Sequence, residues 1–309
     1  MPDISIKKPS VILHDAKLKA RSALGMQVPT DPRRGFTDRM EALSHSVMIG
    51  FKNRPSGAER AATVAACNLA GRIVRKVNDT FAGITFLRKD ESPLMTDVLS
   101  THFGLIDGDT AGGYLKSNVA NKSFSLKAVT EKDRRWVIEK IRRNMLSLSF
   151  HLNTGIYLID IDADNRDIEA GKTIPAGSMS KHTEAYVAHV KDGKDAVTGR
   201  TTSWKLASNF TCGFRRGEMH VSFREMATYS ALSYARVIIH EATHKYLNTT
   251  DLNNGDGYAH SPNYSTNSLV DCLNNADSYA WAAISLYCGS VKMEDHNDPN
   301  NDWSQCQKP

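Results

Sequence analysis

Apolar and polar positions along the chain follow two different periods. Where apolar residues recur every three or four positions, the pattern predicts helices with one buried face. Where apolar residues alternate with polar ones or form short runs between turn residues, it predicts strands. The expected helices cover residues 11–23, 38–51, 57–77, 93–103, 131–152 and 268–287, with Gly289 as a stop, and the expected strands cover 155–161, 183–190 and 218–223.

These elements predict an α+β protein with more than one domain. A chain of 309 residues is long for one domain. We expect a mostly helical accessory domain over 1–128, a second module with a small sheet and two helices over 129–290, and a polar, disordered tail over 291–309. No run of about 18 apolar residues is present, so no membrane span is expected.

The net charge of +5 conceals an uneven distribution. Residues 1–150 hold 25 Lys and Arg against 15 Asp and Glu, whereas the remainder holds 14 against 19. A basic half suits an anionic partner. The basic residues are scattered, however, and no motif that reads RNA or DNA accompanies them, which favours a solvated helical surface and argues against nucleic acid.

The N-terminal sequence and the cysteines indicate in which cellular compartment the protein works. No apolar segment followed by small residues opens the chain, so we expect no ordinary signal peptide. The protein then either stays in the cytoplasm or leaves by a dedicated secretion route. Five cysteines at irregular spacing do not form a disulfide framework. We expect Cys272 and Cys288 to be buried thiols, and a bridge to Cys212 or Cys306 stays open.

The sequence His-Glu-x-x-His occurs at His240, Glu241 and His244. Apolar positions from Ala231 to Ala242 place it within a helix of roughly 15 to 20 residues. The two histidines are one turn apart and therefore face the same way. Imidazole nitrogens in this arrangement suit zinc, and the intervening carboxylate can take a proton from a zinc-bound water.

A third ligand is needed for a catalytic zinc site. A metzincin has histidine six residues after the second histidine, where this chain has Thr250. A gluzincin has a downstream glutamate on a second helix, yet Glu294, in the polar tail, is the only one after His244. The acids that remain are Asp251, Asp256, Asp271 and Asp277.

Two motifs resemble the aspzincins, the family of deuterolysin and the lysine-specific metallo-endopeptidases. They are HKYLNTTD at 244–251 and NADSYA at 275–280. The resemblance covers about the last third of the chain and implies a zincin-like catalytic domain with Asp251 as the third zinc ligand. Asn248 stands where the family has glycine before threonine, and asparagine also tolerates the left-handed turn that ends a helix.

The same resemblance assigns further roles. The family has an oxyanion-stabilising tyrosine three residues after the aspartate. Here that position is Asn254, so Tyr258 is the candidate, while His260 is expected to be a bystander. Asp277 lies beside an apolar face, so its carboxylate requires a partner, which is a zinc-ligating histidine, a backbone group or a substrate cation. The resemblance to the lysine-specific members implies that Asp277 shapes the subsite for a substrate lysine. Strand 218–223 is the candidate for a sheet edge that binds the substrate backbone.

Together these residues predict a zinc-dependent endopeptidase that acts on a protein or peptide, with Glu241 as general base. Without a visible signal peptide, we add the hypothesis of a bacterial effector or toxin whose N-terminal domain binds a delivery or target protein. The alternative is a non-catalytic zinc-binding or protein-interaction module of the same fold, motivated by Asn248 and Asn254. Metal-dependent hydrolysis of a bond other than a peptide is a third hypothesis.

Overall fold

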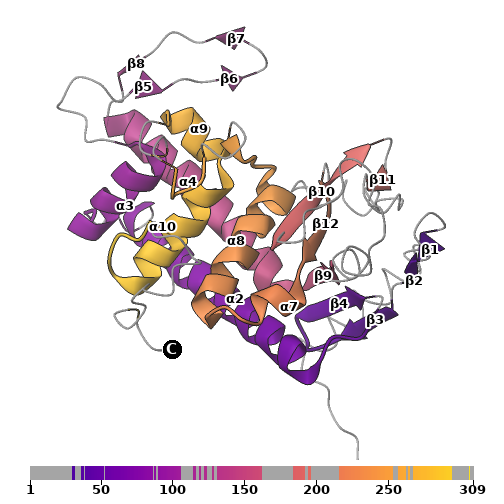
Figure 1. Cartoon of the computed structure of the whole chain (residues 1–309). Coiled ribbons are helices and arrows are strands. Elements are labelled where there is room, and N and C mark those ends of the chain that lie inside the picture. The colour runs from indigo at the N-terminus through magenta and orange to yellow at the C-terminus, as the bar shows by residue number, and fades with distance from the viewer. Residues whose placement is uncertain are drawn as a thin grey trace, which may run out of the picture. The chain divides into compact units, whose positions relative to one another are not determined.

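The computed structural model of the chain describes residues 30–31, 36–37, 39–51, 53–85, 87, 90–105, 114–115, 118–119, 122–123, 127–128, 131–161, 184–191, 194–195, 216–252, 257–261, 264, 267–293 and 306. Helices and a mixed sheet make the protein α+β, as the sequence predicts (Figure 1). The predicted helix at 11–23 lies outside the described residues. None of the described helices combines the length and the hydropathy that crossing a bilayer requires.

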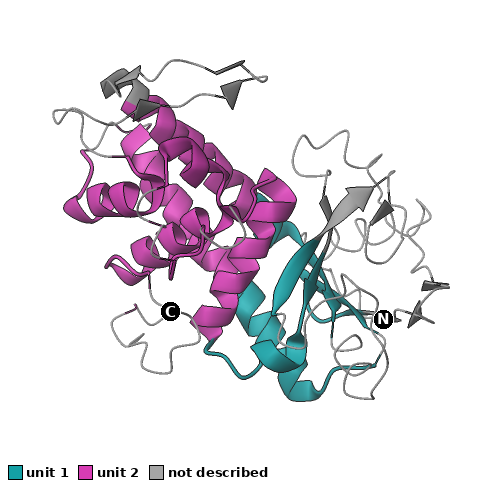
Figure 2. Ribbon diagram, turned by 45° about the horizontal axis from the view of Figure 1, so that its top comes forward, with its two compact units in different colours: residues 1–68, 150–230 teal, residues 69–149, 231–309 magenta. Residues whose placement is uncertain are grey.

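The chain divides into two compact units (Figure 2). Unit 1 comprises residues 1–68 and 150–230, and unit 2 comprises residues 69–149 and 231–309. The boundary expected at 128/129 stays a prediction. Residues 47–50 and 156–159, which lie on either side of that point in the sequence, pair as parallel strands within unit 1.

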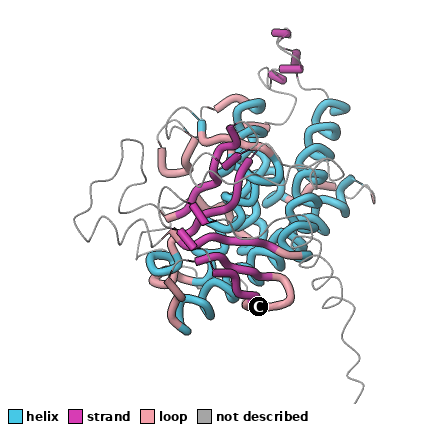
Figure 3. The backbone as a smooth tube through the Cα atoms, turned by 90° about the vertical axis from the view of Figure 1, so that its right-hand side faces the viewer, coloured by secondary structure: helices cyan, strands magenta, loops and turns pink. Residues whose placement is uncertain are grey.

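Unit 1 is built on a six-stranded sheet whose strands lie side by side in Figure 3. In spatial order the strands are β11 (Lys194–Asp195), β10 (Ala185–Lys191), β12 (Arg216–Val221), β9 (Ile156–Asp160), β4 (Val47–Phe51) and β3 (Arg39–Ala42). The central pairs β12–β9 and β9–β4 are parallel, while the outer pairs are antiparallel. Strands β1 (Thr30–Asp31) and β2 (Phe36–Thr37) form a separate ladder, and the short helix α7 (Phe223–Met226) follows β12.

The structure confirms the strands predicted at 155–161, 183–190 and 218–223 but corrects two other expectations. The helix predicted over 38–51 is wrong, because the segment forms the β3–β4 hairpin. The Ser44 hydroxyl accepts the N–H of Val47 in its turn, and all five residues of β4 are buried. The edge role of 218–223 is also wrong, since β12 has hydrogen-bonded neighbours on both sides.

Unit 2 is mainly helical. The helix α10 (Ala276–Cys288) packs against both α8 (Ala231–Leu247) and α3 (Pro93–Phe103) (Figure 1). Tyr279 and Trp281 of α10 are among the largest fully buried side chains. Short ladders join β5 (Tyr114–Leu115) to β8 (Lys127–Ala128) and β6 (Asn118–Val119) to β7 (Lys122–Ser123). The helices are α2 (Gly57–Thr85), which begins in unit 1, α3 (Pro93–Phe103), α4 (Glu131–Thr154), which ends in unit 1, α8 (Ala231–Leu247), α9 (Leu269–Asn274) and α10 (Ala276–Cys288).

These elements confirm the helices predicted at 57–77, 93–103 and 131–152 and the helix predicted around the His-Glu-x-x-His motif. The single helix predicted over 268–287 is instead two, α9 and α10, separated at Asn275. Asn275 is extended, with φ −93° and ψ 130°, and bridges to Thr250 as a short parallel pair. Gly289 ends α10 in the left-handed conformation, as predicted.

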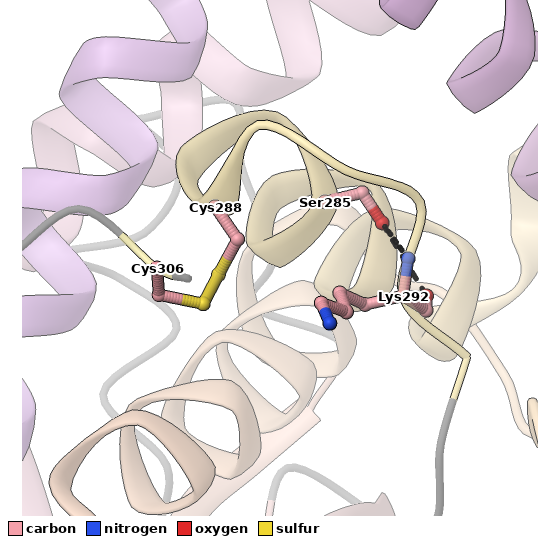
Figure 4. Close-up of a disulfide and its surroundings, with 4 residues drawn as sticks. All are labelled: Ser285, Cys288, Lys292 and Cys306. Atoms are coloured by element: carbon pink, nitrogen blue, oxygen red, sulfur yellow. Dashed lines mark hydrogen bonds between the residues drawn. A yellow bond between two sulfur atoms is a disulfide. The ribbon is translucent and has the colours of Figure 1, made fainter. Parts of the chain in front are cut away.

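A disulfide joins Cys288 at the end of α10 to Cys306 (Figure 4). The free thiol expected at Cys288 is therefore wrong and the alternative of a bridge to Cys306 is confirmed, whereas Cys272 is a buried free thiol as predicted. Nearby, the Ser285 hydroxyl accepts the N–H of Lys292 at 2.9 Å. The tail residues 294–305 and 307–309, and Cys212, lie outside the described residues.

We expect the Cys288→Ala/Cys306→Ala double variant to lose about 3 kcal/mol of unfolding free energy. The bond closes a segment of 18 residues, and cross-linking a loop of that length restricts the unfolded chain by about this amount. Urea unfolding of the oxidised proteins measures the difference. A reducing agent should destabilise the wild type alone, and an equal effect on the variant would contradict the assignment.

His102 on α3 is buried without a charged partner at hydrogen-bonding distance in the described part of unit 2. Its Nδ1 bonds to the Tyr264 hydroxyl at 2.9 Å and its Nε2 to the Ser285 hydroxyl at 3.0 Å. Burial lowers the pKa of His102 to about 3, although the negative charge of Asp277 opposes the shift. The imidazole is therefore neutral in the folded protein at neutral pH.

This burial predicts an acid-sensitive contribution to stability. Below a pH of about 6.5 the unfolded chain protonates His102 while the folded chain does not, so stability falls as pH falls. Between pH 6.5 and 4.5 the loss from this residue is about 2 kcal/mol. We expect His102→Gln to lack this part of the pH dependence in urea unfolding, with exposed His45→Gln as control. Identical slopes for His102→Gln and wild type would refute it.

Candidate metal centre

Helix α8 brings the two histidines of the motif together in unit 2. The Nε2 atoms of His240 and His244 are 3.1 Å apart, and both residues are buried. Oδ1 of Asp251, in the loop after α8, lies 3.2 Å from each Nε2 atom. Among the described residues, this group could hold a metal ion, because its ligand atoms all lie within 4.8 Å of one another.

Hydrogen bonds at the far side of each ring fix which nitrogen carries the proton. His240 Nδ1 lies 2.7 Å from Oδ1 of Asp277, and His244 Nδ1 lies 2.9 Å from the carbonyl of Thr249. Both partners are acceptors, so each Nδ1 is the donor. Both Nε2 atoms then direct lone pairs toward each other and toward Asp251, an arrangement that only a proton or a metal cation between them stabilises.

The loop that carries Asp251 is held at several points. Asn248 ends α8 with φ 59°, so the left-handed conformation predicted for it is confirmed. The hydroxyls of Thr249 and Thr243 are 2.8 Å apart, which ties the turn back to α8. The Thr250 N–H donates to the Asn274 carbonyl at 2.8 Å, and the Thr250 carbonyl accepts the Ala276 N–H. Asp251 therefore follows directly after a backbone anchor.

Asn275 also anchors a second loop. Its Nδ2 donates to the Gly257 carbonyl at 2.7 Å, and the Gly257 N–H donates to the Leu252 carbonyl at 3.2 Å. A Cβ atom at Gly257 would lie 2.7 Å from Asn275 Oδ1 and 2.8 Å from the Leu252 nitrogen, so this close approach requires glycine. Sequence reasoning assigned no role to Asn275, although an asparagine within a helical pattern is a signal of local interruption.

Asp277, at the start of α10, is fully engaged. Its Oδ1 accepts from His240 and from Nη1 of Arg236 at 3.1 Å, and its Oδ2 accepts from the Ala259 N–H at 2.9 Å. Burial raises the pKa of this carboxyl, but the hydrogen bond from His240 and the nearby charges outweigh it and lower the value to about 2. Two of the partners expected for Asp277 are therefore present, the histidine His240 and the backbone N–H of Ala259. The cation beside this carboxylate is Arg236 of the chain itself.

Glu241 is buried and directly follows His240 on α8. Its Oε2 has no hydrogen-bond partner within the part of the chain that the structure describes. Burial raises the pKa of the carboxyl, and the charges of His244 and His240 oppose this shift. A buried carboxylate oxygen without a partner is a ready proton acceptor.

Tyr258 lies beside the same cluster. Its ring stacks on that of His240, with centroids 6.0 Å apart and an angle of 21° between the ring planes. Burial and the surrounding carboxylates raise the pKa of Tyr258 well above its usual value, so the hydroxyl keeps its proton. His260 is exposed, its ring stacks on that of Tyr258 with centroids 5.5 Å apart, and it is not part of the described ligand group.

The other candidate acids do not join the cluster. Asp271 is exposed and accepts the Ser268 hydroxyl at 2.6 Å, where it helps to cap α9. Asp256 and Asn254 lie outside the described residues. Asp251 is therefore the described acid that completes the group.

Charges at the centre favour a divalent cation. Burial lowers the pKa of His240, but hydrogen bonds to Asp251 and Asp277 outweigh burial and raise the value to about 10. Burial likewise raises the pKa of Asp251, and the two imidazoles outweigh it and hold the carboxyl well below its usual range. When both imidazoles are neutral, as metal ligation requires, the charges of Asp251 and Asp277 outweigh that of Arg236, and a divalent cation would balance the excess negative charge.

Comparison with known proteins adds no relative. No family model matches the sequence, and no characterised protein matches it significantly. The resemblance to the aspzincins therefore rests on the motifs at 244–251 and 275–280 and on the chemistry of the residues they contain.

Proposed function

We propose that the protein is a zinc-dependent endopeptidase with a zincin-like catalytic domain. The observation that carries the proposal is the group of His240, His244 and Asp251, whose three ligand atoms lie 3.1 to 3.2 Å apart. Atoms about 2.0–2.1 Å from a tetrahedral zinc lie about 3.3 Å from one another. Two imidazole nitrogens and a carboxylate suit zinc, whereas calcium and magnesium prefer oxygen ligands.

The surrounding residues supply the groups that hydrolysis needs. Zinc in such a site lowers the pKa of a bound water to about 7 and polarises a carbonyl. Glu241 accepts the proton that the attacking water loses and delivers it to the leaving amine. Tyr258 keeps its hydroxyl proton and donates to the oxygen that becomes negative. Asp277 and Thr249 hold the two histidine rings with Nε2 toward the metal.

The substrate class follows from the resemblance and from the partners of Asp277. Similarity to the aspzincins favours peptide bonds over other electrophiles. A lysine preference is not expected here, because Arg236 and His240 already satisfy the carboxylate that would receive the lysine. The Cys288–Cys306 bond suits work in an oxidising compartment, which supports the hypothesis of an exported effector or toxin.

Zinc analysis combined with a peptidase assay tests the proposal. Purified protein should contain about one zinc ion per chain and cleave casein and peptides with or without lysine. A strong chelator should abolish cleavage, and added zinc should restore it. Mass spectrometry of the fragments identifies the bonds that are cut.

The alternative of a non-catalytic zinc-binding module predicts a different result. That module would contain one zinc ion and leave every peptide intact, although the partner-free carboxylate oxygen of Glu241 favours catalysis. Absence of zinc, even after reconstitution, would refute both functions.

A further inference from the structure

Arg236 is a buried cation one helical turn before His240. Its exposed fraction is 5%, and it lies on the same face of α8 as the first ligand. Nη1 donates to Asp277 at 3.1 Å, and the guanidinium carbon lies 5.4 Å from the centre of the Trp281 ring. Neither the His-Glu-x-x-His motif nor the role of Glu241 accounts for this residue.

Burying a guanidinium costs several kcal/mol, so its contacts must compensate for the lost hydration. Arg236 has a charged acceptor in Asp277 and an aromatic face in Trp281, both from α10. Asp277 is buried as well, with a side chain 3% exposed. Without the arginine, this carboxylate would keep its two other donors but lose the cation on its own atom Oδ1.

The same oxygen orients a ligand of the metal. Oδ1 of Asp277 accepts both from Arg236 and from Nδ1 of His240, while Oδ2 holds the N–H of Ala259, next to Tyr258. Fixing Asp277 therefore fixes the His240 ring and one end of the loop that carries Tyr258. A carboxylate that accepts from a ligating histidine also makes the imidazole a stronger donor to the metal.

We propose that Arg236 is a positioning residue of the metal centre, acting through Asp277 on His240 and on the Tyr258 loop. The proposal rests on the metal site of the proposed function but not on its peptidase activity. Arg236 also takes the cation position on Asp277 from inside the protein, so that a substrate cation has no place there.

Zinc affinity tests this role, measured for the purified chain by competition with a chelating dye. Arg236→Met keeps the length of the side chain and its packing on Trp281 but removes the charge. We expect this variant to bind zinc about 10- to 100-fold more weakly, the range for partners of ligating groups. Arg236→Lys restores a cation and should recover most of the affinity.

Arg134→Met is the matched control. Arg134 is a buried arginine in the same unit, paired with Glu91 at 2.9 and 2.6 Å and with the Leu105 carbonyl. Its replacement should lower the unfolding midpoint while leaving zinc affinity at the wild-type value. Equal losses of zinc affinity in Arg134→Met and Arg236→Met would mean that a general loss of stability is responsible, and would overturn the proposal.

A double-variant comparison tests the route through Asp277. If Arg236 acts on His240 by way of that carboxylate, Arg236→Met should weaken zinc binding no further once Asp277→Asn is present. The double variant also removes both buried charges, so it stays informative where Arg236→Met alone folds poorly. Additive losses, or wild-type affinity in folded Arg236→Met protein, would overturn the proposal. Because no substrate is used, failure of the peptidase assay leaves this result unaffected.

Discussion

Glu241→Gln protein should retain about one zinc ion per chain and hydrolyse peptides about 10²- to 10⁴-fold more slowly than the wild type. Glutamine has the same shape as glutamate but cannot accept a proton at neutral pH. The Oε2 atom has no partner in the described structure, so the substitution breaks no observed hydrogen bond of that atom. Initial rates on casein measure the loss of hydrolysis, and elemental analysis of the same preparations measures the zinc content per chain.

Glu225→Gln is a suitable control for this measurement. Glu225 is a glutamate in the first turn of α7, in unit 1, and belongs to no described ligand group. Its variant should match the wild type in zinc content and rate. Cleavage by Glu241→Gln at the wild-type rate would exclude Glu241 as the base, and loss of zinc from that variant would show that the substitution disturbs the ligands.

Asp251→Ala should bind zinc more than about 100-fold more weakly than the wild type, because even partners of ligands contribute 10- to 100-fold. Asp251 supplies the one oxygen ligand of the described group and its only anionic ligand. Its side chain is 37% exposed, so we expect its removal to affect the metal far more than the fold. Elemental mass spectrometry at matched protein concentration measures zinc per chain.

Asp271→Ala is the control for this variant, since Asp271 is exposed at the start of α9 and makes a capping contact. It should keep its full zinc content. Full zinc in Asp251→Ala would move the third ligand to another residue, with Asp256 and His260 as the next to replace. It would also remove the main link between this chain and the aspzincin pattern.

The two histidines of the candidate metal group could be predicted because their geometry is local, whereas Asp251 was expected from the resemblance to the aspzincins. Two histidines four residues apart on a helix face the same way in any fold, and the left-handed turn at Asn248 depends on one residue. The contact between Arg236 and Asp277 spans 41 residues, and nothing in the sequence marks the two as partners. The residues that orient His240 become neighbours only through tertiary packing.

The wrong predictions also concern features that depend on distant parts of the chain. The run VMIGF at 47–51 is short and wholly apolar, so its period does not distinguish a buried strand from a helix. Pairing with β9, where Ile49 lies opposite Leu158, makes this segment a strand. Likewise, the break in the last helix depends on the distant Thr250, and the disulfide depends on where the chain brings Cys306.

The closed base of the loop after Asp251 explains how the proposed active centre can accommodate added sequence. The Leu252–Gly257 hydrogen bond and the Asn275 side chain fasten both ends of the segment 253–256. Extra residues between such ends change the length of the loop without moving the residues that flank it. In the proposed aspzincin-like site, Tyr258 can therefore take the tyrosine's role from four positions beyond Asn254, since its ring stacks on that of His240. A sequence pattern that demands a fixed spacing from aspartate to tyrosine would overlook chains built in this way.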